Sequence, residues 1–247
     1  VNALFGDPPD DREVDSILRA TIGEMVEAGA DTVSVEIPGL DELTSASGVI
    51  NYEAKFDLMD YFAATPGAPV SSLKEILDQG LYDEALEGAF LRRERVESRD
   101  PEAYLAAMAK RDALAAALLK VLDENDLDAL VYPTVRRRPA LIGEGQSGST
   151  CQVSAGSGLP ALAVPGGFTE DGLPTALELL GRPFDDAHLV AMAYAYEQAV
   201  HPRRDPPAAP PLEDGAAPAP IAFEVAPGAG PGEGETFRGH FVFDPVL

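Results

Sequence analysis

Residues 158–167 read GLPALAVPGG, and residues 172–181 read GLPTALELLG. Each stretch opens on Gly-Leu-Pro, continues as an apolar run and closes on glycine. Short apolar runs between turn residues are typical of strands that are covered on both faces of a sheet. We therefore predict strands at 161–165 and 175–180. Gly166 and Gly167 lie in no GxGxxG or Walker pattern, so we interpret them as a turn that ends the first strand.

The rest of the chain predicts helices that alternate with short strands. Spacings of three and four between apolar residues predict helices over 13–28 and 186–200, and a further helix follows Asp100-Pro101. Residues 41–64 also read as helix, and Ser72 with Glu75 forms a capping box for a short helix that ends near Gly80. The stretches DTVSVEIP at 31–38 and LDALVYPT at 127–134 predict strands.

These elements together predict an α/β fold, with part of a mixed β-sheet covered by helices, over residues 1–201. Residues 202–220 are dominated by proline and alanine and predict an extended linker. Residues 221–247 alternate as strands do but are too few to form a β-domain. We expect them to be the start of a second, β-rich module.

Composition excludes several classes of partner. The net charge of −24 would repel nucleic acid, and no apolar run approaches the roughly 18 residues that a membrane helix requires. Cys151 is the sole cysteine, which excludes an intrachain disulfide framework and a zinc cluster. The chain begins VNALFGDPPDD without methionine, so we expect its start to be internal to a longer gene product.

No residue stands out as a catalytic group by its spacing. The histidines, His188, His201 and His240, form neither an HExxH pair nor a recognisable Ser-His-Asp arrangement. In GEGQSGST at 143–150, glycines flank Ser147 and Ser149, but the GxSxG spacing of a nucleophile elbow is not met. A backbone-dense loop beside a pocket is the better interpretation of that segment.

Three blocks nevertheless carry a family resemblance: LDALVYPT, GSTCQVSAGSGLPALAVPGGF at 148–168, and GLPTALELLGRPFDDAHLVAMAYAYEQA at 172–199. In this order they resemble the C-terminal half of the amidase-signature hydrolases. LFGDPPDD at 4–11 and INYEAKFDLMDYFAATPGAPVSSLKEIL at 50–77 are similar to the segment that precedes it. The resemblance covers about residues 1–200, and it implies that the two Gly-Leu-Pro runs are neighbouring strands beside a substrate cleft.

The resemblance also implies a Ser-Ser-Lys triad that this chain does not match. In such enzymes one serine attacks the amide carbonyl, a second relays the proton and a lysine is the general base. No Gly-Gly-Ser-Ser run occurs here, and the lysines, Lys55, Lys74, Lys110 and Lys120, all lie in helical stretches. No catalytic residue is therefore carried over. The family often has an asparagine near the position of Thr150, from which this sequence departs.

By the same resemblance, Tyr132, Thr134, Gln152 and Ser154 would border a small-molecule amide substrate. The chain is thus expected to be the substrate-pocket half of an amidase that works through a serine acyl-enzyme, with no metal or organic cofactor. Its expected partner is the N-terminal catalytic half. Two alternatives remain: a non-catalytic binding or scaffold module derived from this fold, and one chain of a heteromeric amidase.

Overall fold

A computed structural model describes residues 1–6, 11–99 and 101–205. The chain divides into two compact units. One comprises Val1–Val49 with Asp100–Arg203, and the other is built around Ile50–Arg99. Residues 206–220 of the expected linker and the whole expected tail at 221–247 lie outside the described residues, so these boundaries stay predictions.

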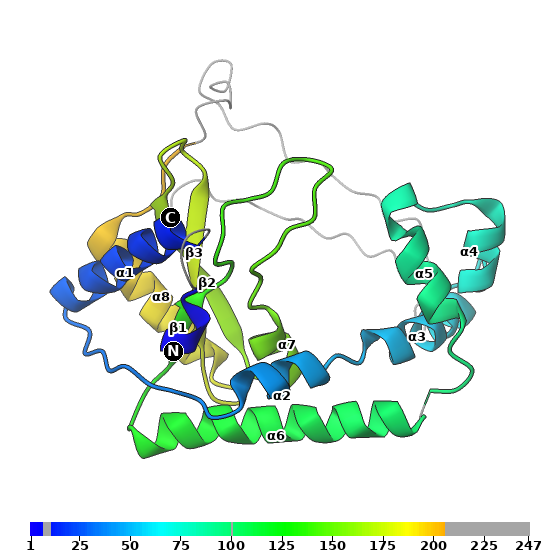
Figure 1. Ribbon diagram of the computed structural model, residues 1–247, viewed down its shortest axis with the longest axis horizontal. Helices are drawn as coiled ribbons and strands as arrows, with labels where there is room; N and C mark the ends of the chain where they lie inside the picture. The colour runs from blue at the N-terminus through cyan, green and yellow to red at the C-terminus, as the bar shows by residue number, and fades with distance from the viewer. Residues whose placement is uncertain (7–10, 100, 206–247) are drawn as a thin grey trace, which may run out of the picture. The chain divides into compact units, whose positions relative to one another are not determined.

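The first unit contains an antiparallel sheet of three strands (Figure 1). The strands are β1 (Leu130–Pro133), β2 (Ala161–Phe168) and β3 (Pro174–Leu180), in the order β1-β3-β2. The two Gly-Leu-Pro runs are neighbouring strands, as predicted. The prediction of a mixed sheet is wrong for the described residues, because both strand pairs are antiparallel.

Residues 31–37 explain the difference, because the strand predicted there does not form. The alternation identified the inward side chains only in part, since Val35 and Ile37 are buried but Val33 is exposed. A strand also requires a paired neighbour. Within the described part of the chain, a single backbone hydrogen bond links residues 31–36 to another segment, from Asn2 N–H to Val35 O at 3.3 Å.

Helices cover both faces of the sheet (Figure 1). On one face lie α1 (Arg12–Glu27) and α8 (Asp186–Val200). The other face packs on α2 (Leu40–Ala46), α6 (Glu102–Glu124), α7 (Gln152–Ser157) and the short η1 turn (Asn2–Leu4). Strand side chains alternate between the faces, so Leu177 and Leu179 pack with α1 and α8 while Leu180 packs with α6. This two-sided cover explains the near-continuous apolar runs.

The Pro-Gly-Gly at the end of the first run is not a turn, which corrects that interpretation. Gly166 and Gly167 lie inside β2, beneath helix α1. A Cβ on Gly166 would lie 2.5 Å from Leu18 Cδ2, and one on Gly167 would lie 2.5 Å from Ile17 Cγ2. Glycine is present because the helix approaches the strand too closely for any side chain.

The predicted helices form with small changes of boundary. Helix α8 matches 186–200 and buries Leu189, Ala193 and Tyr196. The helix predicted over 41–64 is two helices, α2 and α3 (Ile50–Ala64), which belong to different units.

The second unit consists of α3, α4 (Leu73–Gln79), the η2 turn (Glu84–Leu86) and α5 (Glu87–Glu94). The Ser72 half of the predicted capping box is confirmed, because Glu75 N–H donates to Ser72 Oγ at 3.2 Å. The Glu75 carboxylate accepts from the N–H of Ser71 at 2.8 Å. Lys55 of α3 pairs with Glu94 of α5 at 3.2 Å. That ion pair joins two helices of the unit.

Candidate functional site

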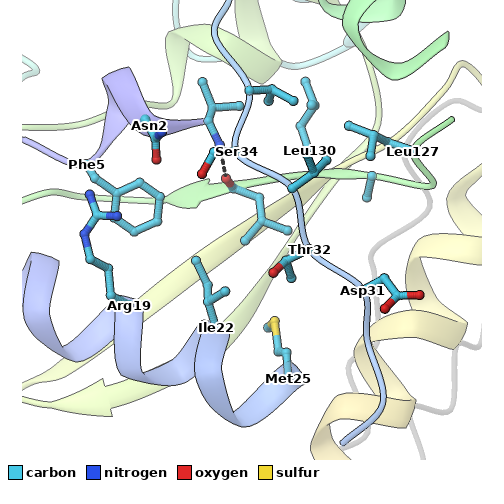
Figure 2. A pocket seen from close by; sticks show the side chains of 15 residues that line it. Asn2, Phe5, Arg19, Ile22, Met25, Asp31, Thr32, Ser34, Leu127 and Leu130 are labelled. Carbon is cyan, nitrogen blue, oxygen red and sulfur yellow. Dashed lines mark hydrogen bonds between the residues drawn. The ribbon is translucent and has the colours of Figure 1, made fainter. Parts of the chain in front are cut away.

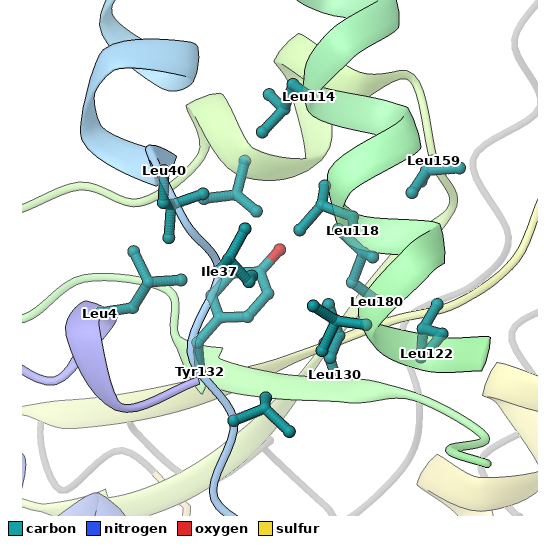
Figure 3. Close-up of a cluster of buried hydrophobic side chains, with 13 residues drawn as sticks. Leu4, Ile37, Leu40, Leu114, Leu118, Leu122, Leu130, Tyr132, Leu159 and Leu180 are labelled. Carbon is teal, nitrogen blue, oxygen red and sulfur yellow. The ribbon is translucent and has the colours of Figure 1, made fainter. Parts of the chain in front are cut away.

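Tyr132 and Glu178 form a buried polar pair in the first unit. Tyr132 lies on β1 opposite Glu178 on β3, and its hydroxyl donates to Glu178 Oε1 at 2.8 Å. The tyrosine is fully buried and lies among the leucines of α6, including Leu114 and Leu118 (Figure 3). Burial raises the pKa of Tyr132, and the charge of Glu178 raises it further. The phenol therefore stays protonated and donates to the carboxylate.

Ser154 of α7 reaches the same tyrosine. The nearby Ser154 side chain lowers the pKa of Tyr132 and so opposes that rise, while Ser154 Oγ itself donates to Cys151 O at 3.3 Å. The structure thus brings together two of the predicted pocket residues. Glu178, their third member, was missed by the sequence analysis. Its signal was a lone carboxylate inside the apolar run PTALELL, because a buried charge requires a partner.

Thr134 and Thr150 fix the end of β1 to the start of α7. The Thr134 N–H and hydroxyl both donate to Ala176 O, at 3.1 and 3.0 Å. Thr150 is buried, its N–H donates to Thr134 O at 3.2 Å, and its hydroxyl donates to Thr134 O at 3.0 Å and to Pro133 O. Thr150, the position near which the family often has asparagine, therefore holds the end of β1 against the start of α7.

Gln152 is anchored to a neighbouring helix of the same unit. Its Nε2 donates to Ser47 Oγ, directly after α2, at 2.9 Å. A Cβ on Gly156 would lie 2.6 Å from the same Ser47 oxygen, so α7 packs tightly there. Thr134 is thus bonded to Thr150, Gln152 is bonded to the end of α2, Tyr132 is buried in the core, and Ser154 is half-buried on α7.

The serines of the 143–150 loop have structural partners. Ser147 Oγ accepts from Arg137 Nη1 at 3.2 Å, and Ser149 Oγ accepts from the Cys151 N–H at 3.3 Å. Among the described hydrogen bonds, neither hydroxyl contacts a histidine or a lysine that could act as a base. His188 Nδ1 lies 3.3 Å from Asp185, and His240 is outside the described residues. This geometry gives no activated nucleophile.

The described residues offer neither a metal site nor a membrane span. They hold no cluster of three or more histidine, cysteine, aspartate or glutamate side chains arranged for a metal ion. None of the described helices has the length and apolar character needed to cross a bilayer.

Two adjoining cavities lie elsewhere in the first unit. The smaller, of about 300 Å³, is bounded by residues 31–35, by residues 127–131 and by α1 (Figure 2). The larger, of about 750 Å³, extends toward α8 and shares Met25, Val33 and Val131 with the first. Neither is lined by Tyr132, Thr134, Gln152 or Ser154. The assignment of those four residues to a substrate pocket therefore stays a prediction.

The first unit is a three-layer α/β structure, with a buried tyrosine–carboxylate pair in its sheet. Comparison with known proteins shows the family to which the chain belongs. The sequence model of the amidase family matches residues 5–190, so the chain belongs to that family. One subunit of the glutamyl-tRNA(Gln) amidotransferase of Brevibacillus brevis is 28% identical over 79% of this chain and 43% of its own length. A putative amidase of Synechocystis sp. is 30% identical over 38% of this chain and 21% of its own.

The fold comparison agrees with the sequence comparison. The peptide amidase of Stenotrophomonas maltophilia superposes with a TM-score of 0.68 at 29% identity, covering 78% of this chain and 41% of that one. A second structure of a peptide amidase, in complex with the competitive inhibitor chymostatin, gives the same TM-score. The chain spans about two fifths of the length of these relatives. It therefore corresponds to part of an amidase domain.

Proposed function

We propose that this chain is the substrate-pocket half of an amidase-type hydrolase, which cleaves carboxylic amides through a serine acyl-enzyme. The observation that carries the proposal is the family match over residues 5–190, in a chain whose sequence contains no Gly-Gly-Ser-Ser run. The Ser-Ser-Lys residues would be supplied by the N-terminal part of the domain. The four residues predicted to border the substrate would then give its pocket shape and hydrogen bonds. They are Tyr132, Thr134, Gln152 and Ser154.

The residues assigned to the pocket suit that role chemically. Ser154 and Gln152 carry hydrogen-bonding side chains on one short helix, and Thr134 holds the adjacent strand end in place. The Tyr132–Glu178 bond fixes the strand beneath them. A rigid strand and helix that orient a few polar groups are what acyl transfer requires of a binding surface, because the nucleophile gains from a fixed carbonyl position.

The test joins this chain to its proposed complement. An amidase N-terminal segment with the Lys and Ser-Ser motifs is fused before Val1, and hydrolysis of a chromogenic anilide is followed. We expect turnover by the fusion and only background from the chain alone, since the residues that the structure describes include no activated nucleophile. In the fusion, Ser154→Ala or Gln152→Ala should lower kcat/KM by about threefold to tenfold, the usual net effect of one hydrogen bond. Ser147→Ala is the matched control and should leave kcat/KM unchanged.

Two results would count against the proposal. Turnover by the isolated chain that survives Ser147→Ala and Ser149→Ala would show that the chemistry resides in this chain. A folded fusion that binds the anilide without turnover would favour the alternative of a non-catalytic module. The alternative of a heteromeric amidase is tested by mixing this chain with the N-terminal segment as two separate chains. Full activity of that mixture, without fusion, would support it.

A further inference from the structure

Three consecutive arginines, Arg136, Arg137 and Arg138, follow the end of β1. The chain holds 42 acidic residues against 18 lysines and arginines, so carboxylate partners are plentiful. Arg137 Nε donates to the Asp11 carboxylate at 2.7 Å. The Arg138 guanidinium forms an ion pair with Glu13. Two of the three guanidinium groups are therefore held by carboxylates of the first unit.

Arg136 differs from its two neighbours. It is half-buried, and its Nε is buried without a hydrogen-bond partner. Within the described part of the first unit, no other buried side-chain nitrogen or oxygen lacks a partner. Buried polar groups are normally hydrogen-bonded, because burial removes them from water. Since a guanidinium is always positively charged in proteins, the unfilled position at Arg136 is suited to an anion.

The backbone of Arg136 lies at the strand end that carries the predicted pocket residues. Arg136 N–H donates to Gly148 O at 2.9 Å, and Thr150 N–H donates to Thr134 O at 3.2 Å. An isolated antiparallel bridge lies between these two bonds. Arg136 is therefore held by the same two segments that position Thr134 and the start of α7, the helix that carries Gln152.

The opposite segment packs closely on the arginines. A Cβ on Gly148 would lie 3.1 Å from Arg137 Cγ and 3.5 Å from Arg136 Cβ. Arg137 also fastens this segment, because its Nη1 donates to Ser147 Oγ at 3.2 Å. The base of the Arg136 side chain is thus confined beside Gly148. A confined side chain loses less conformational freedom when it binds a ligand, so Arg136 is preorganised for binding.

We propose that Arg136 binds a carboxylate on the substrate, so that the substrate class is an amide that carries a free carboxylate close to the scissile bond. The inference rests on the proposed function, since it adds a specificity-determining residue to the same pocket. A carboxylate matches the guanidinium fork, in which Nε and one Nη donate in parallel to its two oxygens. A dianion such as phosphate is disfavoured, because the net charge of −24 repels it more strongly than a monoanion.

The experiment compares two anilides that differ in charge and share one shape. The fusion of the N-terminal amidase segment with this chain is given the mono-para-nitroanilide of succinic acid, or that of succinamic acid, in which a neutral carboxamide replaces the carboxylate. We expect kcat/KM to be about tenfold to hundredfold higher for the carboxylate, the usual effect of hydrogen bonds to a charged group. Arg136→Gln should bring the ratio of the two values close to one.

Two further variants separate the guanidinium of Arg136 from general charge. Arg138→Gln is the matched control, since it removes the same charge two residues away from a side chain that is already paired. It should leave the ratio of kcat/KM values unchanged. Arg136→Lys keeps the charge but loses the planar fork, so its ratio should lie between those of the unaltered fusion and Arg136→Gln. Circular dichroism confirms that each variant folds.

A binding measurement tests the same site without hydrolysis. Proton–nitrogen correlation NMR spectra of the fusion, with isotope-labelled arginine, show the Nε–H signals, and Arg136→Gln identifies the signal of Arg136. Titration with succinamate, which carries one carboxylate and one amide, should shift that signal, because its Nε–H gains an acceptor. Titration with succinamide, the neutral diamide, should leave it in place.

The proposal is overturned if the unaltered fusion hydrolyses both anilides equally well, or if Arg138→Gln lowers the ratio as much as Arg136→Gln. It is also overturned if succinamate leaves the Arg136 signal unmoved, which is the result expected when a carboxylate of the N-terminal segment already fills the position. A shift of that signal without turnover of either anilide would refute the proposed function alone. Equal turnover of both anilides would refute the role of Arg136 alone.

Discussion

Gly166→Ala should destabilise the protein although it removes a flexible residue from a strand. The new Cβ would lie 2.5 Å from Leu18 Cδ2, 3.0 Å from Thr175 Oγ1 and 3.3 Å from Thr175 O. Leu18 cannot turn away, because it is fully buried between α1 and the sheet. The helix must therefore move from the strand, or the strand must bend.

The magnitude follows from two opposing effects. Overpacking a buried contact of this kind costs about 2–3 kcal/mol, in the upper part of the usual range. Removal of a glycine from a strand returns about 0.5–1 kcal/mol. The net loss is about 1–2.5 kcal/mol, which for a chain of this length corresponds to a Tm lower by about 2–10 °C.

Gly23→Ala is the matched control. Gly23 lies in α1, on the helix that Gly166 contacts, and a Cβ there would meet nothing within 4 Å. Alanine in a helix interior is favoured over glycine by about 0.8–1 kcal/mol, so the Tm should rise by about 2–4 °C. Both variants are compared by thermal unfolding followed by circular dichroism. An unchanged or higher Tm for Gly166→Ala would refute the argument that close helix–strand approach requires this glycine.

Two further predictions concern the buried tyrosines. Tyr132→Phe leaves the buried Glu178 carboxylate without its described tyrosine donor, so urea unfolding should show a loss of about 1–3 kcal/mol. Tyr132→Phe combined with Glu178→Leu should recover part of that loss, and no recovery would contradict the pairing. Burial raises the pKa of Tyr196 to about 12 from its ordinary value of 10.0. The folded state then holds its proton where the unfolded state has lost it, so stability should fall as pH rises from 10 to 12, and Tyr196→Phe should flatten that fall in pH-dependent unfolding.

Local patterns predicted the helices well because the signals are local. The face of α8, the Ser72 cap and the proline at the start of α6 each depend on residues within a few turns. The two apolar runs likewise predicted strands, while the family resemblance predicted that these strands are neighbours. The break between α2 and α3 was missed, since Gly48 offers only a weak signal inside an otherwise helical pattern.

The candidate site was only partly accessible to sequence reasoning. Resemblance to the family suggested Tyr132 and Ser154, and the structure brings them together. Glu178 was not predicted, because its role depends on the register that places it opposite Tyr132. Cross-strand register joins residues 46 positions apart, and no local pattern encodes it.

Local periodicity in the sequence was enough to predict the order of helices and apolar strands and many of the buried side chains, and the quoted motifs were enough to indicate the family. Periodicity failed for Ile50, Tyr61 and Leu105, which are exposed. Only the tertiary structure decided that Gly166 and Gly167 allow helix α1 to approach β2, that Tyr132 and Glu178 share a hydrogen bond, and that residues 31–37 form no strand. The physical reason is the same in each case. Close packing, cross-strand register and strand pairing depend on a second segment distant in the chain, and its position is fixed only when the whole unit folds.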